Sequence, residues 1–122
     1  MVTRALPFAL ALTVAALAPL LAQAHAFLQH ADPKVGAAVA RAPPSIRLTF
    51  TEGVVAPFCR VTVTGPPGFG GAGAPHAVPG DARTLAVDLK GAAPPGAYSI
   101  HWRVLSADTH VTEGDFRFQV RP

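Results

Sequence analysis

The sequence predicts an antiparallel β-sandwich that follows a secretory signal peptide. Apolar and polar residues alternate in five segments, which is the pattern of half-buried strands. Glycine and proline are frequent, with 11 and 13 copies, and this composition suits a β-protein with tight connections. No segment after residue 24 has the 3.6-residue apolar period of an amphipathic helix. These three observations favour an all-β domain.

Residues 1–24 have the organisation of a signal peptide. Arg4 supplies a positive charge, residues 6–21 form an almost unbroken apolar run, and Ala22-Gln23-Ala24 supplies the small residues that signal peptidase requires. The alternative is an uncleaved membrane anchor, but the run is short for a span and has prolines near both ends. We therefore expect cleavage after Ala24, export to the periplasm, and a working domain of residues 25–122 that does not span the membrane.

The elements of this domain follow in order. Residues 25–33 are expected to be semi-extended, and residues 34–44 to form a connection, with at most one helical turn over residues 34–41. Residues 65–80 are expected to form a loop or a loose hairpin, because glycine and proline recur there. The strands predicted from alternation are residues 46–50, 60–64, 85–89, 98–104 and 116–120. Trp102 lies on the apolar side of the longest of them and is predicted to occupy the centre of the core.

The charge distribution argues against nucleic-acid binding, and the cysteine count excludes an intramolecular disulfide. The formal net charge is +3, and the charges are scattered, so we expect no nucleic-acid binding. The single cysteine, Cys59, excludes an intramolecular disulfide, and we interpret it as a buried thiol.

A candidate metal site combines the new N-terminus with one loop. Cleavage after Ala24 would make His25 the first residue, and its α-amine and Nδ1 could close a six-membered chelate ring on one metal. Asp108 and His110 are two residues apart, so in an extended segment both side chains would point to the same face. His25, Asp108 and His110 would together supply three nitrogens and one oxygen. This set suits Cu(II) in a flat arrangement, and Zn(II), which prefers a tetrahedron, is the main competitor.

Three segments resemble the CopC-type periplasmic copper-binding proteins. They are residues 25–28 (HAFL), 46–52 (IRLTFTE) and 102–110 (WRVLSADTH). The resemblance covers residues 25–122 in the same order. It implies an immunoglobulin-like Greek-key β-sandwich or barrel of about seven strands and a Cu(II) site at His25, Asp108 and His110.

The resemblance also implies a function. The protein would sequester, buffer or hand on copper in copper resistance or homeostasis, with an inner-membrane copper transporter of CopD type as its partner. We expect a monomer without enzymatic activity. Neither the copper affinity nor the direction of copper flow follows from the sequence.

The chain departs from the family in two places. Relatives that also bind Cu(I) carry a methionine-rich loop, whereas the one methionine here is Met1. A soft thioether site is therefore absent, and we expect a Cu(II)-only member. Many relatives continue the ligand loop as Gly-His-Pro, whereas this chain has Thr109-His110-Val111, which leaves both ligands in place.

Four further polar residues have open roles. His30 could be an additional or axial ligand, or a surface residue. Glu52 could support the site or bond a turn. His76 and His101 are expected to be solvated, and His101 falls on the polar side of its strand.

Two other functions compete with copper binding. An N-terminal histidine chelate with a second histidine is also the copper site of lytic polysaccharide monooxygenases. Against that reading, residues 25–122 leave little surface for a polysaccharide, and Asp108 would occupy a position that oxygen chemistry needs open. A metal-free immunoglobulin-like interaction module is the third possibility, and it is supported by fold alone.

Overall fold

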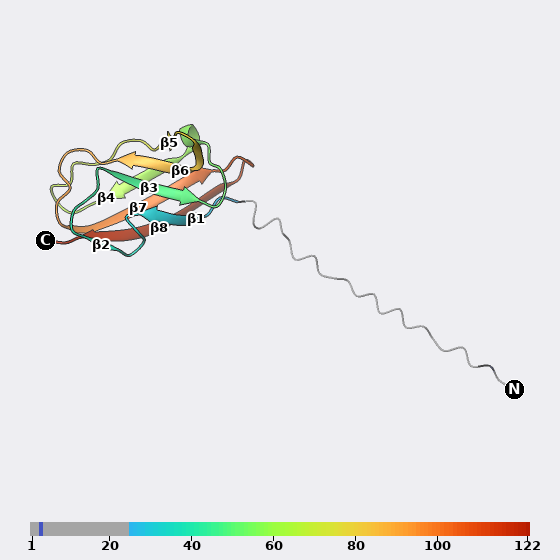
Figure 1. The fold of residues 1–122 in the computed structure, drawn as a ribbon, viewed down its shortest axis with the longest axis horizontal. Coiled ribbons are helices and arrows are strands. Elements are labelled where there is room, and N and C mark those ends of the chain that lie inside the picture. Colours follow the sequence, from blue (N-terminus) through green and yellow to red (C-terminus); the bar gives the residue numbers. More distant parts are fainter. Residues whose placement is uncertain (1–2, 4–24) are drawn as a thin grey trace.

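The domain is a sandwich of two β-sheets (Figure 1). The computed structural model describes Thr3 and residues 25–122, so the predicted signal peptide, apart from Thr3, lies outside the described residues. The described elements are the strands β1 (Leu28–Asp32), β2 (Ala38–Val39), β3 (Ser45–Phe50), β4 (Arg60–Thr64), β5 (His76–Val78), β6 (Asp81–Asp88), β7 (Gly96–Leu105) and β8 (Val111–Val120), and the short 3₁₀ helix η2 (Ala56–Phe58).

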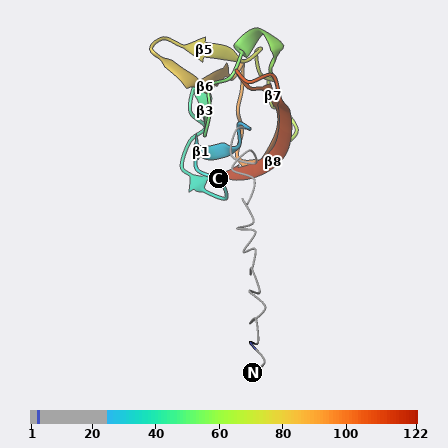
Figure 2. The same cartoon turned by 90° about the vertical axis from the view of Figure 1, so that its right-hand side faces the viewer.

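Each sheet contains four strands. The first has the order β1-β3-β6-β5 and the second has the order β2-β8-β7-β4. Figure 2 shows the two sheets facing one another, with β1, β3, β5 and β6 on one side and β7 and β8 on the other. All pairs are antiparallel except β2 with β8, where Ala38 and Val39 lie beside Gln119 and Val120 in parallel register. The predicted fold class is therefore confirmed.

All five strands predicted from alternation are present, and β1 forms in the segment expected to be semi-extended. Two short strands occur in segments expected to be a connection and a loop or loose hairpin. β2 lies within residues 34–44, and β5 lies within residues 65–80. The helical turn allowed for residues 34–41 does not form. A 3₁₀ turn occurs instead at η2, which has a proline in its first turn.

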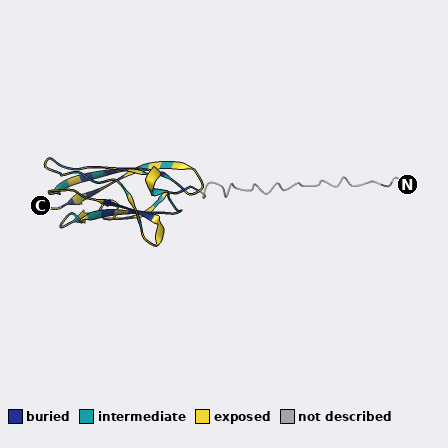
Figure 3. Cartoon of the chain, turned by 90° about the horizontal axis from the view of Figure 1, so that it is seen from above, coloured by how far each residue is buried: buried dark blue, intermediate teal, exposed yellow. Residues whose placement is uncertain are grey.

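The core forms where the inward residues of the two sheets meet. Trp102 is 5% exposed and packs edge-to-face on Phe50, with 5.2 Å between ring centroids. Tyr98 stacks on Phe118 at 5.1 Å. The prediction of Trp102 as a core residue is confirmed, and Figure 3 shows buried stretches recurring in both layers of the sandwich.

One end of the sandwich is closed by contacts between three connections. The N–H of Val55 donates to the carbonyl of Leu105 at 2.9 Å, and the N–H of Ala107 donates to that of Gly53 at 2.9 Å. The N–H of Thr51 donates to the carbonyl of Phe27 at 2.8 Å. The segment after β3, the β7–β8 loop and the start of the domain therefore lie together. In the part of the chain that the structure describes, no helix has the length and apolar character needed to cross a bilayer.

Candidate metal centre

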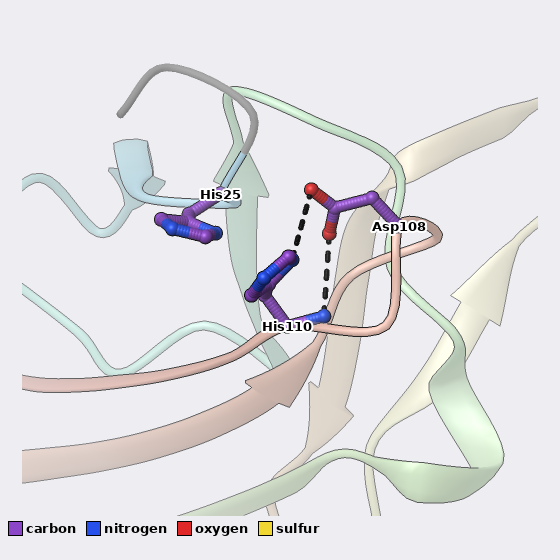
Figure 4. Close-up of side chains that lie close together, drawn as sticks. All are labelled: His25, Asp108 and His110. Atoms are coloured by element: carbon purple, nitrogen blue, oxygen red, sulfur yellow. Dashed lines mark hydrogen bonds and ion pairs between the residues drawn. The ribbon is translucent and has the colours of Figure 1, made fainter. Parts of the chain in front are cut away.

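His25, Asp108 and His110 meet at this closed end of the sandwich (Figure 4). Each offers one potential ligand atom, and these atoms all lie within 4.8 Å of one another. The ring centroids of His25 and His110 are 4.2 Å apart with an interplanar angle of 61°. Nδ1 of His110 lies 3.2 Å from Oδ2 of Asp108. The structure thus brings together the three residues that the sequence pattern selects.

A tight turn, rather than an extended segment, brings Asp108 and His110 together. The N–H of Ser106 donates to the carbonyl of His110 at 2.9 Å, and the N–H of Thr109 donates to the carbonyl of Ser106 at 2.9 Å. Thr109 has φ +73°, a region that β-branched residues rarely adopt. The expectation of an extended segment is therefore wrong, because the chain must reverse between β7 and β8.

Ser106 holds the carboxylate of this turn. It is 1% exposed, its hydroxyl donates to Oδ1 of Asp108, and its Oγ accepts the backbone N–H of His110 at 3.3 Å. The Ser106 hydroxyl is the main cause of a lowered pKa at Asp108, and the N–H and ring of His110 lower it further. Hydrogen bonds to the ionised form favour that form. Asp108 therefore presents a fixed negative charge at neutral pH.

The segment that carries His25 is bonded to both sheets. The N–H of Phe27 donates to Oγ1 of Thr51 at 3.0 Å, and that hydroxyl donates to the carbonyl of His25 at 3.3 Å. From the second sheet, Oγ1 of Thr112 donates to the carbonyl of Ala26 at 2.5 Å. Ala26 itself is fully buried. Neither threonine could be identified from the sequence, because their partners lie far away along the chain.

The ring of His25 contains a buried nitrogen that lacks a partner. Among the described residues, Nδ1 of His25 accepts and donates no hydrogen bond although it is inaccessible to solvent. A buried polar atom without a partner is costly and calls for an explanation such as a bound ion. Nδ1 is also the ring nitrogen that can chelate together with the α-amine of the same residue. The donor set and this atom therefore both fit a metal ion.

Other candidate residues lie elsewhere. His30 and Glu52 are exposed, and neither belongs to the described group of three possible ligands. Cys59 is only half-buried, and its thiol donates to the carbonyl of Val55 at 3.2 Å. Burial raises the pKa of this thiol, which disfavours the thiolate that binds metals. His76 is exposed, as expected, and lies 3.3 Å from Asp88.

A second histidine–carboxylate group lies on the outer face of the second sheet. His101 is exposed as predicted, but its ring lies between two carboxylates: Nδ1 is 2.8 Å from Asp115 and Nε2 is 3.1 Å from Glu113. The Asp115 carboxylate is the main cause of a raised pKa at His101, and Glu113 adds to it. The pairing of His101 with Asp115 follows from the β7–β8 register. The alternation of acidic residues along the outward side of β8 is the feature of the sequence that could have predicted this group.

Comparisons with known proteins show the family of this chain. The CopC domain model matches residues 28–121. Protein YobA of Escherichia coli strain K12 is 36% identical over 119 residues, which cover 97% of this chain and 96% of the relative. Copper resistance protein C of Escherichia coli is 33% identical over 107 residues, which cover 82% of this chain and 84% of the relative.

A solved structure extends the similarity to three dimensions. The crystal structure of CopC from Methylosinus trichosporium OB3b matches with a TM-score of 0.70 and 31% identity, covering 80% of this chain and 95% of that chain. Fold, sequence and extent of the match agree, and the resemblance predicted from three short segments is confirmed. The chain belongs to the CopC family.

Proposed function

We propose that this protein is a periplasmic copper-binding protein that holds Cu(II) between His25, Asp108 and His110. The observation that carries the proposal is the buried Nδ1 of His25, which has no hydrogen-bond partner among the described residues, beside two further candidate ligands within 4.8 Å. Family membership supports copper as the ion, since similar proteins are named copper resistance protein C. Its role would be to sequester, buffer or hand on copper in resistance or homeostasis.

Secretion completes the site in this proposal. A peptide nitrogen is a poor ligand, whereas cleavage after Ala24 would give His25 a free α-amine. The amine and Nδ1 would then chelate one ion, and a ring nitrogen of His110 and a carboxylate oxygen of Asp108 would complete four donors. Nitrogen and oxygen donors in a flat arrangement suit Cu(II), which leads the divalent affinity order. The charge of Asp108 would offset part of the charge of the ion.

Cu(II) fits this donor set better than Cu(I). Cu(I) prefers soft thioether and thiolate ligands. The one methionine is Met1, which belongs to the predicted signal peptide, and the raised pKa of Cys59 favours its neutral thiol. We further propose that the exported protein is a monomer and exchanges copper with an inner-membrane transporter of CopD type, as its family suggests.

The test is mass spectrometry of the exported protein together with its copper content. We expect a chain that begins at His25 and retains stoichiometric Cu(II) after gel filtration. A chain that begins at His25 but loses copper as readily as its Asp108→Ala/His110→Ala variant would overturn the proposal. A chain that begins elsewhere and still retains Cu(II) would overturn the role of the terminal amine.

A further inference from the structure

We infer that Thr112 is a positioning residue of the copper site, whose hydroxyl fixes the segment carrying His25 relative to the strand that follows His110. The inference rests on the proposed function, because Thr112 can act in this way only if His25 binds the ion. It assigns to Thr112 no direct contact with copper.

The position of Thr112 in β8 indicates that its hydroxyl has a specific use. Alternate residues of this strand point into the sandwich, and the first of them is a threonine. The inward residues of β8 are Thr112, Gly114, Phe116, Phe118 and Val120. Thr112 is paired across the sheet with Val104, which is fully buried. An aliphatic side chain would suit this environment, and the hydroxyl of Thr112 instead donates to the carbonyl of Ala26 at 2.5 Å.

This hydrogen bond joins the two halves of the site. Ala26 follows His25 directly, and Thr112 lies two residues after His110, so the bond connects residues that are 86 positions apart in the chain. Ala26 is fully buried, and its carbonyl would lack this partner without the hydroxyl. Chain termini are poorly ordered unless they are tied down. Fixing the terminus before the ion arrives reduces the entropy lost on binding.

Thr51 and Thr112 have complementary roles. Thr51 follows β3 and bonds residues 25–27 to the first sheet through the N–H of Phe27 and the carbonyl of His25. Thr112 bonds the same segment to the second sheet. The turn containing Asp108 and His110 connects two strands of that second sheet. Thr112 therefore sets the separation between His25 and the other two ligands.

The test compares Thr112→Val with Thr112→Ser in the processed protein. Valine keeps the shape and removes the hydroxyl, and we expect Cu(II) affinity to fall by about three- to tenfold, the range of one lost hydrogen bond. Serine keeps the hydroxyl and should bind as the wild type does. Competition with a coloured chelator measures affinity, and thermal melting of the metal-free protein checks folding. Thr112→Ala removes the same hydroxyl without added bulk, should the valine variant not fold.

A matched control separates positioning from general destabilisation. Thr84 is 4% exposed, and its hydroxyl bonds Asp81 at 2.6 Å and Thr49 at 2.8 Å in the first sheet. Thr84→Val removes a threonine hydroxyl that is more deeply buried than that of Thr112 and lies away from the site. It should lower the melting temperature while leaving Cu(II) affinity unchanged.

A double-mutant cycle tests the coupling directly. In an Asp108→Ala/His110→Ala background, the amine and ring of His25 form the remaining chelate on a single residue, so Thr112→Val should have no further effect. An equal loss of Cu(II) affinity in both backgrounds would overturn the inference. It would also be overturned if Thr112→Val bound Cu(II) as tightly as the wild type while His25→Ala bound it weakly. Unchanged affinity in His25→Ala would instead overturn the proposed function.

Discussion

Two groups of histidine and carboxylate side chains on this molecule contain the same donor types in different surroundings. The first, the terminal cluster, consists of His25, Asp108 and His110. The second, the face cluster, consists of His101, Glu113 and Asp115. The terminal cluster lies at one closed end of the sandwich, on a turn and on the start of the domain. The face cluster lies on the open outer side of β7 and β8.

The two clusters differ in whether they contain a buried histidine nitrogen that has no partner among the described residues. In the face cluster both ring nitrogens of His101 lie against carboxylates, and the His101 side chain is 46% exposed. In the terminal cluster Nδ1 of His25 is buried and has no partner among the described residues. Exposed ion pairs contribute little stability, whereas a buried nitrogen without a partner is costly. Donor types alone therefore do not distinguish the two clusters, whereas a buried nitrogen without a partner makes the terminal cluster the better candidate for a metal site.

The largest expected effect is on copper binding by the terminal cluster. His25→Ala in the processed protein should weaken Cu(II) binding by more than about 100-fold, since even residues that merely support a ligand change affinity by about 10- to 100-fold. His101→Ala is the matched control in the face cluster and should leave affinity unchanged. Isothermal titration of both variants measures the difference. Equal losses would contradict the distinction drawn between the two clusters.

A smaller effect is expected from Ser106, which supports the terminal cluster. Ser106→Ala removes the hydrogen bond that lowers the pKa of Asp108, so this carboxyl should accept a proton at higher pH. Metal ligands must be deprotonated, and the variant should lose Cu(II) at a higher pH than the wild type during acid titration. At neutral pH we expect affinity to fall by about tenfold, the lower end for supporting residues. Ser99→Ala on β7, the strand that precedes Ser106, is the control. If both variants lost Cu(II) over the same acidic pH range, this role of Ser106 would be contradicted.

The smallest effect concerns the face cluster and the stability of the metal-free protein. The pKa of His101 is raised in the folded state, first by Asp115 and then by Glu113. Its contribution to stability is therefore complete below the unfolded pKa of about 6.5 and is lost as the pH rises through the folded pKa. Urea unfolding at several pH values should show this decline in the wild type and a flatter profile in His101→Gln. Parallel profiles would show that the pairing is energetically neutral.

Much of the fold could be predicted because period-2 alternation marks strands that have one buried face. Residues 98–104 and 116–120 were assigned correctly for this reason, and both have buried residues at alternate positions. β2 and β5 contain two and three residues, too few for alternation to be recognised. The parallel pairing of β2 with β8 depends on tertiary position. Local pattern carries no information about it.

The residues of the candidate site could be selected from the sequence more fully than their arrangement. Donor type and the predicted cleavage site selected His25, and spacing selected Asp108 and His110. The turn that brings the latter two together depends on Thr109 at φ +73°, a conformation that threonine does not suggest. The support from Thr112 depends on a partner 86 residues away. Such contacts exist only once both sheets have assembled.

The ligands of the terminal cluster are unequally accessible, and this has a kinetic consequence. The side chains of His110 and Asp108 are 58% and 33% exposed, whereas Nδ1 of His25 is buried. In the proposed site, an incoming chelator could therefore replace the outer donors one at a time while the amine and Nδ1 of His25 would still hold the ion. We expect copper to leave by stepwise ligand exchange, at a rate that rises with competitor concentration. A tightly held ion would then remain quickly transferable to a protein that presents its own ligands at this end.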